Sequence, residues 1–136
     1  IFPCFPKLIS KFNNLIIQAI LADKTLYVSG VLGLDQQAQL VCGGAESQTR
    51  QALDNLKHVL EAGSSSLPGV VKTTILLSNM DDFQVVNQIY AQYFPKDFPA
   101  RATYQVAKLP LGAAVEIEAI ALIILSIYTF TVQHKD

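Results

Sequence analysis

The sequence predicts an α+β domain of two layers, in which one mixed β-sheet carries two helices on a single face. The length of 136 residues is that of one ordinary domain and suffices to bury a hydrophobic core without disulfides or metals. Strand and helix patterns follow one another in the order ββαβαββ, with no internal repeat or linker. Because two helices can cover only one face of such a sheet, the other face needs a partner.

The first two strands are predicted at residues 15–22 (LIIQAILA) and 25–31 (TLYVSGV). Both runs are rich in β-forming residues, and Asp23 and Lys24 between them indicate a hairpin, so we expect antiparallel pairing. The polar segment 35–44 (DQQAQLVCGG) then connects this hairpin to the first helix and ends in a Gly-Gly turn.

The first helix is predicted over residues 46–62, where apolar residues recur at steps of three and four, and Gly63 ends it. These residues are Ala52, Leu53, Leu56, Val59 and Leu60. The strand that follows, 70–78 (VVKTTILLS), is apolar or β-branched at both alternating sets of positions, a pattern typical of strands that are covered on both faces.

The second helix is predicted after Asp81 or Asp82, either of which could cap it, and before Pro95. Its apolar positions are Val85, Val86, Ile89, Tyr90 and Tyr93. A strand at 100–109, a turn at 110–112 and a closing strand at 114–124 complete the predicted fold.

Composition favours an oligomer and argues against several classes of partner. Ten basic and eleven acidic residues give a net charge of −1, which disfavours a dedicated nucleic-acid or anionic-membrane binder. The 51% hydrophobic content and the mean hydropathy of +0.33 are high for a small soluble monomer. We therefore expect the uncovered sheet faces of several copies to meet and form the core of an oligomer.

Cysteine, histidine and apolar segments suggest neither a metal site nor a membrane span. Cys4 and Cys42 cannot form a disulfide framework and predict a reducing compartment, cytoplasmic or alternatively mitochondrial or nuclear. His58 is expected to be a solvated helix residue and His134 lies in the tail, so no metal ligand set is predicted. Residues 1–10 lack the pattern of a secretory signal, and the 14 uncharged residues 119–132 fall short of the roughly 18 that a membrane span needs.

Candidate chemistry rests on charged residues within apolar strands, because the sequence contains no nucleophile elbow, phosphate loop or dinucleotide fingerprint. Arg101 opens an apolar strand, and Glu116 and Glu118 share one face of the closing strand. Spacing alone favours a structural ion pair between this arginine and a glutamate of a neighbouring strand. The alternative is that the guanidinium binds a substrate carboxylate with two hydrogen bonds.

Three blocks and one helix carry a resemblance that covers residues 18 to 121. The blocks are YVSGVLGLD (27–35), VVKTTILLSNMDDFQVVNQIYAQYF (70–94) and FPARATYQVAKLPLGAAVEIEAIA (98–121), and the helix is QALDNLKHVLEAG (51–63). With these motifs the chain resembles the reactive-intermediate deaminase (RidA, or L-PSP translation-inhibitor) family. The resemblance implies a chorismate-mutase-like subunit in a homotrimer with clefts between subunits, and no cofactor.

The resemblance also implies an activity and its residues. Family members hydrolyse reactive enamines and imines, such as 2-aminoacrylate and 2-iminobutanoate, to 2-keto acids and ammonia. Arg101 corresponds to the arginine that binds the substrate carboxylate, and Glu116 to the glutamate that positions water or transfers protons. Further substrate contacts are implied for the backbone amide of Thr103, where many relatives have cysteine, and for Ser29, Gly30 and Asn87.

The chain departs from the family pattern at one cleft position and at both ends. Ile16, in NLIIQA (14–19), replaces a tyrosine that covers the cleft in relatives, which predicts that activity is reduced, retargeted or lost. The segments 1–14 and 122–136 are atypical of the single domain. Two alternatives therefore stay open: a non-catalytic trimeric module that binds small carboxylates or client proteins, and a ribonuclease that inhibits translation.

Overall fold

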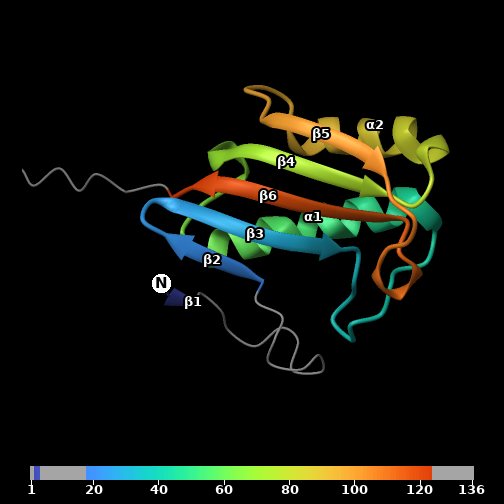
Figure 1. Ribbon diagram of the computed structural model, residues 1–136, viewed down its shortest axis with the longest axis horizontal. Helices are drawn as coiled ribbons and strands as arrows, with labels where there is room; N and C mark the ends of the chain where they lie inside the picture. Colours follow the sequence, from blue (N-terminus) through green and yellow to red (C-terminus); the bar gives the residue numbers. More distant parts are fainter. Residues whose placement is uncertain (1, 4–17, 124–136) are drawn as a thin grey trace, which may run out of the picture.

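The computed structural model describes residues 2–3 and 18–123, which form one mixed sheet with two helices (Figure 1). The sheet order is β1-β2-β3-β6-β4-β5. The strands are β1 (Phe2–Pro3), β2 (Ala19–Ala22), β3 (Thr25–Leu32), β4 (Val70–Leu77), β5 (Ala100–Gln105) and β6 (Val115–Leu122). The helices are α1 (Gly44–Ala62) and α2 (Phe83–Tyr93), and short 3-10 turns occur at η1 (Leu67–Gly69), η2 (Met80–Asp82) and η3 (Pro110–Gly112).

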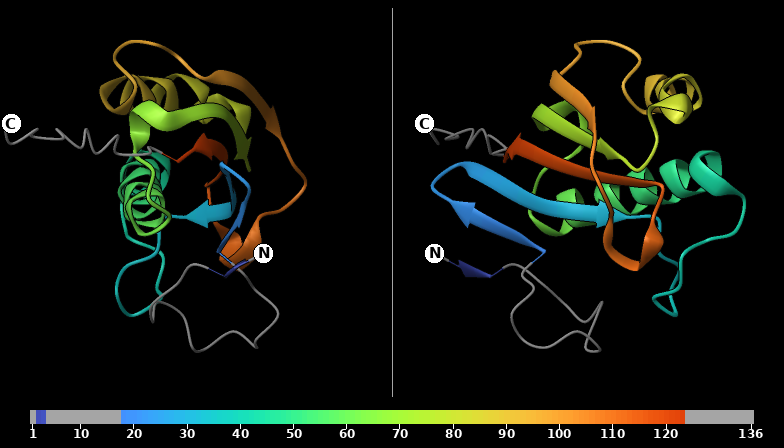
Figure 2. Two further views of the ribbon diagram at one scale, coloured as in Figure 1. Left: turned by 90° about the vertical axis from the view of Figure 1, so that its left-hand side faces the viewer. Right: turned by 45° about the vertical axis from the view of Figure 1, so that its right-hand side comes forward.

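The predicted two-layer α+β architecture is confirmed. Strand β5 runs parallel to β4, whereas the other neighbouring strands pair antiparallel, so the sheet is mixed. Both helices pack on the same face, as the edge-on view shows (Figure 2). The predicted hairpin is also confirmed, since Ala22 pairs with Thr25 across the turn at Asp23 and Lys24.

The hydrophobic core lies between the helices and one face of the sheet. Thr73, Ile75 and Leu77 of β4 point toward the helices, as do Val115 and Ile117 of β6, and all are buried. Helix α1 meets them with the predicted apolar stripe, of which Ala52, Leu53, Leu56 and Leu60 are fully buried. The core therefore follows directly from the alternation along the strands and the helical spacing.

The opposite face of the sheet, here called the open face, is covered by neither helix. On β4 it presents Lys72, Thr74 and Leu76, and on β6 it presents Glu116 and Glu118. The expectation that β4 is covered on both sides is thus not met within one subunit, since the helices lie on the other face. Tyr27, Tyr104 and Leu122 are large apolar side chains left about half exposed.

Several element boundaries differ from the predictions by a few residues, and so does the cap of α2. The strand expected at 100–109 ends at Gln105, because its partner β4 ends at Leu77 and the last bond of that ladder runs from Val106 N to Leu77 O. The closing strand spans 115–122 instead of 114–124. Neither aspartate caps α2 through its side chain; Asn79 Oδ1 instead accepts from Asp81 N, and α2 continues from η2.

The short strand β1 was not predicted, because two residues carry no periodicity; it pairs with β2 through Phe2 and Leu21 and through Pro3 and Ile20. The predictions that concern Cys4, Ile16, His134 and the part of the uncharged segment beyond residue 123 fall outside the described residues. Within residues 2–3 and 18–123, no helix is long and apolar enough to cross a membrane. His58 is exposed, as expected of a solvated helix residue.

Candidate functional site

Arg101 lies on the edge strand β5 and extends over α2. Its strand partner is Thr73, which is buried on the helix side, so Arg101 belongs to that side as well. The Arg101 Nη1 donates to Asn87 Oδ1 at 2.6 Å, and its guanidinium carbon lies 4.9 Å from the ring centroid of Tyr90 and 6.0 Å from that of Phe83. The guanidinium is therefore exposed to solvent yet held on two sides.

The simpler interpretation, an ion pair between Arg101 and a glutamate of a neighbouring strand, is wrong. Strand β5 neighbours β4 alone, and β6 lies beyond β4. Arg101 also points to the helix side, whereas Glu116, opposite Leu76, points to the open face. Along the described ranges 2–3 and 18–123, no carboxylate pairs with Arg101, and most of its five N–H donors remain available.

Thr103 lies two residues after Arg101, on the same face of β5. The N–H of Val106, directly after β5, donates to Leu77 O and therefore points toward β4. Since N–H groups alternate between the two sides of a strand, the N–H of Thr103 points toward the free edge of the sheet. The Thr103 hydroxyl is buried and has no hydrogen-bond partner within the part of the chain that the structure describes.

Glu116 lies half-buried on the open face, with its carboxyl group against Gly30 of β3. A methyl group at Gly30 would overlap that carboxyl group, so the close approach requires glycine. Ser29 and Gly30 occupy an irregularity in the pairing of β3 with β6, between Val28 and Val31. Burial, and then repulsion from Glu118, raise the pKa of Glu116 above its usual value.

The predicted site residues therefore form two separate groups. We call the first the arginine half-site, which comprises Arg101, Asn87 and Thr103 on the helix side of the β5 edge. The second is the glutamate half-site, which comprises Glu116, Ser29 and Gly30 on the open face. Members of each group lie together, but the sheet itself separates the two groups within one copy of the chain.

Sequence reasoning missed the aromatic support of Arg101. Phe83, Asn87 and Tyr90 follow one another at steps of four and three, so they share one face of α2. That spacing predicted Tyr90 as a core residue, which is confirmed by its burial. The same spacing could also have placed both rings beside Asn87, but only the tertiary structure brings β5 across this helix face. Phe98 is 73% exposed in a single copy of the chain.

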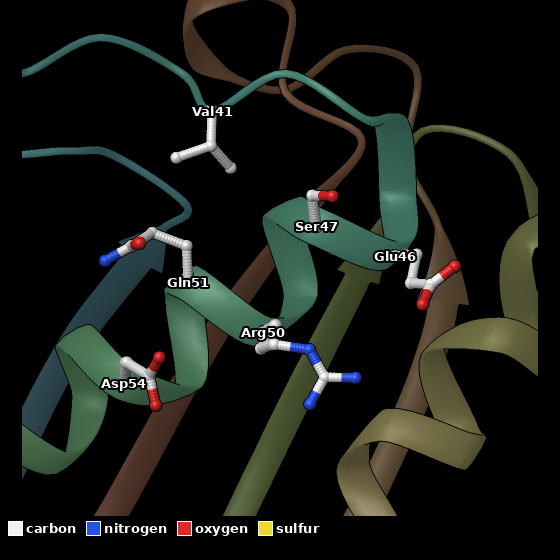
Figure 3. Close-up of a pocket in the computed structure, with 6 residues that line it drawn as sticks. All are labelled: Val41, Glu46, Ser47, Arg50, Gln51 and Asp54. Carbon is white, nitrogen blue, oxygen red and sulfur yellow. The ribbon is translucent and has the colours of Figure 1, made fainter.

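A shallow pocket of about 210 Å³ lies elsewhere, along the N-terminal half of α1 and the loop before it (Figure 3). It is lined by Val41, Glu46, Ser47, Arg50, Gln51 and Asp54, none of which was a predicted site residue. Beside it, Tyr93 of α2 donates to Asp54 Oδ1 at 2.7 Å; burial and this carboxylate raise the pKa of Tyr93 to about 12. Across residues 2–3 and 18–123, no three His, Cys, Asp or Glu side chains group as metal ligands.

Comparisons with known proteins converge on one family. Residues 9–123 match the family described as endoribonuclease L-PSP. A Homo sapiens protein named 2-iminobutanoate/2-iminopropanoate deaminase is 51% identical over 106 residues, which cover 77% of each chain. The structure of RidA from the Antarctic bacterium Psychrobacter is similar with a TM-score of 0.83 and 35% identity, over 90% of this chain and 99% of that one. The structure of E. coli TdcF with bound serine is similar with a TM-score of 0.75 and 28% identity, over 80% and 88%.

Proposed function

The chain belongs to the endoribonuclease L-PSP family, and from this premise we propose that it hydrolyses reactive 2-imino acids to 2-keto acids and ammonia. The human relative that shares half of its aligned residues is named for deamination of 2-iminobutanoate and 2-iminopropanoate. One observation carries the proposal: an exposed guanidinium, fixed by Asn87 and aromatic rings, pairs with no carboxylate of the described chain. Such a group is suited to bind the carboxylate of a small acid.

The arginine half-site would hold the substrate. Arg101 offers two parallel N–H donors to a carboxylate, and the N–H of Thr103 at the free edge of β5 offers a third. A relative whose structure contains bound serine is consistent with a site for small molecules that carry a carboxylate. Asn87 contributes through Arg101 in this arrangement, since its oxygen already accepts from the guanidinium.

A complete site would need a second copy of the chain. A substrate bound at Arg101 lies on the helix side, and Glu116 of the same copy lies on the other side of the sheet. The glutamate would therefore come from a neighbouring copy, in a cleft between subunits. The open face supports such contact, because it exposes Tyr27, Tyr104 and Leu122, and the homotrimer typical of the family would provide three such clefts.

The chemistry requires little beyond placement. Water adds to the carbon of the C=N bond, its proton passes through solvent or a carboxylate, and the imine nitrogen gains a proton. The resulting carbinolamine expels ammonia as the C–N bond breaks and the C=O bond forms. Glu116, whose raised pKa favours the protonated form, would donate and recover a proton during these steps. The remaining rate acceleration would come from holding an already reactive imine in the correct orientation.

Replacement of Arg101 tests this function. Arg101→Ala should abolish the acceleration of 2-iminobutanoate hydrolysis, because the substrate carboxylate loses its counter-charge, while the oligomeric state stays unchanged. The measurement follows decay of enzymatically generated 2-iminobutanoate with and without protein, together with sedimentation velocity. Arg50→Ala on α1 is the matched control and should keep full activity, since the Arg50 guanidinium bonds Gln92 and belongs to neither half-site. Full activity of Arg101→Ala would refute the assigned role.

The two alternatives make different predictions in the same assay. A non-catalytic carboxylate-binding module would bind a keto acid but leave the decay of 2-iminobutanoate unchanged. A ribonuclease is favoured by the family's name alone. Within residues 18–123 the chain offers a single, exposed histidine, His58, and the whole sequence carries a net charge of −1, neither of which suits RNA cleavage by a histidine pair.

A further inference from the structure

We propose that Tyr90 is a positioning residue for the Arg101 guanidinium and that, together with Asn87, it sets the direction in which this group faces a carboxylate. The inference rests on the proposed function and concerns the same site. It assigns a role to a buried aromatic residue that sequence spacing marks only as part of the core.

The ring of Tyr90 lies beneath the guanidinium. At 4.9 Å from the ring centroid, the guanidinium carbon is well within the range of about 6 Å over which a cation is attracted to an aromatic face. Phe83 lies at the limit of that range, at 6.0 Å, on the same side of α2. The rings therefore restrict the tilt of the guanidinium plane and its distance from α2.

Asn87 restricts the remaining rotation within that plane. Its Oδ1 accepts from Arg101 Nη1 at 2.6 Å, which uses one of the five N–H donors of the guanidinium. An aromatic face and one hydrogen bond together fix the orientation of a planar group. An exposed arginine without such support would sample many side-chain conformations and would lose that freedom when it binds a ligand.

Tyr90 can act as a support because it is itself held firmly. It is 5% exposed, its ring stacks on Phe94 with centroids 4.5 Å apart, and its hydroxyl shares a 2.8 Å hydrogen bond with Thr73 Oγ1. Thr73 is also the residue that pairs with Arg101 across β4 and β5. The register of the two strands therefore places Arg101 beside the residue that anchors its support.

Two substitutions at position 90 separate the ring from the hydroxyl. Tyr90→Phe keeps the ring and should bind 2-oxobutanoate, a stable planar keto acid, within about twofold of the parent. Tyr90→Leu removes the ring and should bind it about tenfold more weakly, which corresponds to about 1.4 kcal/mol and lies within the usual range of a cation–π contact. Isothermal titration calorimetry measures both constants, well below the melting temperature of each variant.

Tyr93→Leu is the matched control. Tyr93 lies one turn further along α2, is partly buried and bonds Asp54 instead of approaching Arg101. The Tyr93→Leu substitution should therefore lower the melting temperature without changing the affinity for 2-oxobutanoate. Parent-like binding by Tyr90→Leu, or an equal loss of affinity in Tyr93→Leu or Tyr90→Phe, would overturn the inference.

If Tyr90→Leu fails to fold, a second measurement tests whether Tyr90 positions the guanidinium. In Arg101→Ala the support formed by Tyr90 and Asn87 is still present, so added methylguanidinium should restore part of the 2-oxobutanoate affinity. Methylammonium, which cannot lie flat on the ring while bonding Asn87, should restore much less. No rescue, or equal rescue by both cations, contradicts the proposal. A parent protein that leaves the decay of 2-iminobutanoate unchanged would instead remove the proposed function itself, so the two failures are distinguishable.

Discussion

Glu116 and Gly30 illustrate how the proposed site depends on contact between single residues. The carboxyl group of Glu116 lies against the backbone of Gly30, and burial raises its pKa. Motif resemblance identified both residues separately. It could not show that one makes room for the other, because that contact joins β3 to β6 across the sheet. Residue identity was therefore predictable, whereas the physical reason for the glycine needed the structure.

Gly30→Ala should impair catalysis more than folding. The added methyl group overlaps the Glu116 carboxyl group, which is the mobile end of a side chain and can move aside, and the backbone of Gly30 avoids the left-handed region. We expect deaminase activity to fall at least about tenfold, as is usual for a displaced acid or base, while the melting temperature changes little.

Gly44→Ala provides the opposite control. Its methyl group would enter open space, but its φ of +67° disfavours any residue except glycine, so stability should fall by about 1 kcal/mol with activity unchanged. Unaltered activity in Gly30→Ala would argue against a role for the position of Glu116.

The raised pKa of Glu116 predicts a pH-dependent effect on stability. The folded state holds this proton more tightly than the unfolded state does, so the associated stabilisation is full below the unfolded pKa of about 4.5 and is lost as the pH rises through the higher folded pKa. Glu116→Gln cannot ionise and avoids this loss. Its free energy of unfolding relative to the parent should therefore increase between pH 4 and pH 7, by less than about 1 kcal/mol because the group is half exposed. Urea unfolding at both pH values measures it, and a gain that is constant with pH would contradict the assignment.

At the scale of secondary structure, local patterns predicted each main element and the pairing of β2 with β3, but not how the other strands pair. Helical spacing identified α1 and α2, and runs of apolar and β-branched residues identified β4 and β6, because those signals reside in neighbouring residues. The order β6-β4-β5 depends on contacts distant in the sequence, so Arg101 and Glu116 were wrongly assigned to neighbouring strands. Strand β5 was also predicted too long, since nothing within it records where its partner β4 ends.

The contact between α1 and α2 includes a hydrogen bond that can be removed cleanly. Tyr93→Phe deletes the bond to Asp54 Oδ1 and keeps the ring, so the free energy of unfolding should fall by about 1 kcal/mol. The parent should also show a tyrosine that ionises at a pKa of about 12, which ultraviolet titration detects and the variant lacks. Tyr27→Phe on the open face, which removes an equally small group outside the helix contact, is the control. An equal loss of stability there would mean that the bond to Asp54 contributes nothing specific.

At the scale of the whole molecule, composition and fold both favour a partner for the open face. The high hydrophobic content predicted a partner for the uncovered sheet face, and the structure leaves large side chains such as Tyr27 and Leu122 about half exposed on that face. The proposed site gives an independent argument, since its two halves lie on opposite faces of one sheet. Sequence alone could not supply this argument, because it did not reveal which face Arg101 occupies.

The separation of the two half-sites predicts that two inactive variants can complement each other in a mixed assembly. On the proposed arrangement, Arg101→Ala and Glu116→Ala should each disable every cleft of an assembly made from one kind of chain. When the two inactive proteins are unfolded together and refolded as a mixture, some clefts pair an intact arginine from one chain with an intact glutamate from another. An equimolar mixture should regain about a quarter of the parental activity if chains assort at random. A mixture as inactive as its parents would place both residues in the same chain's site.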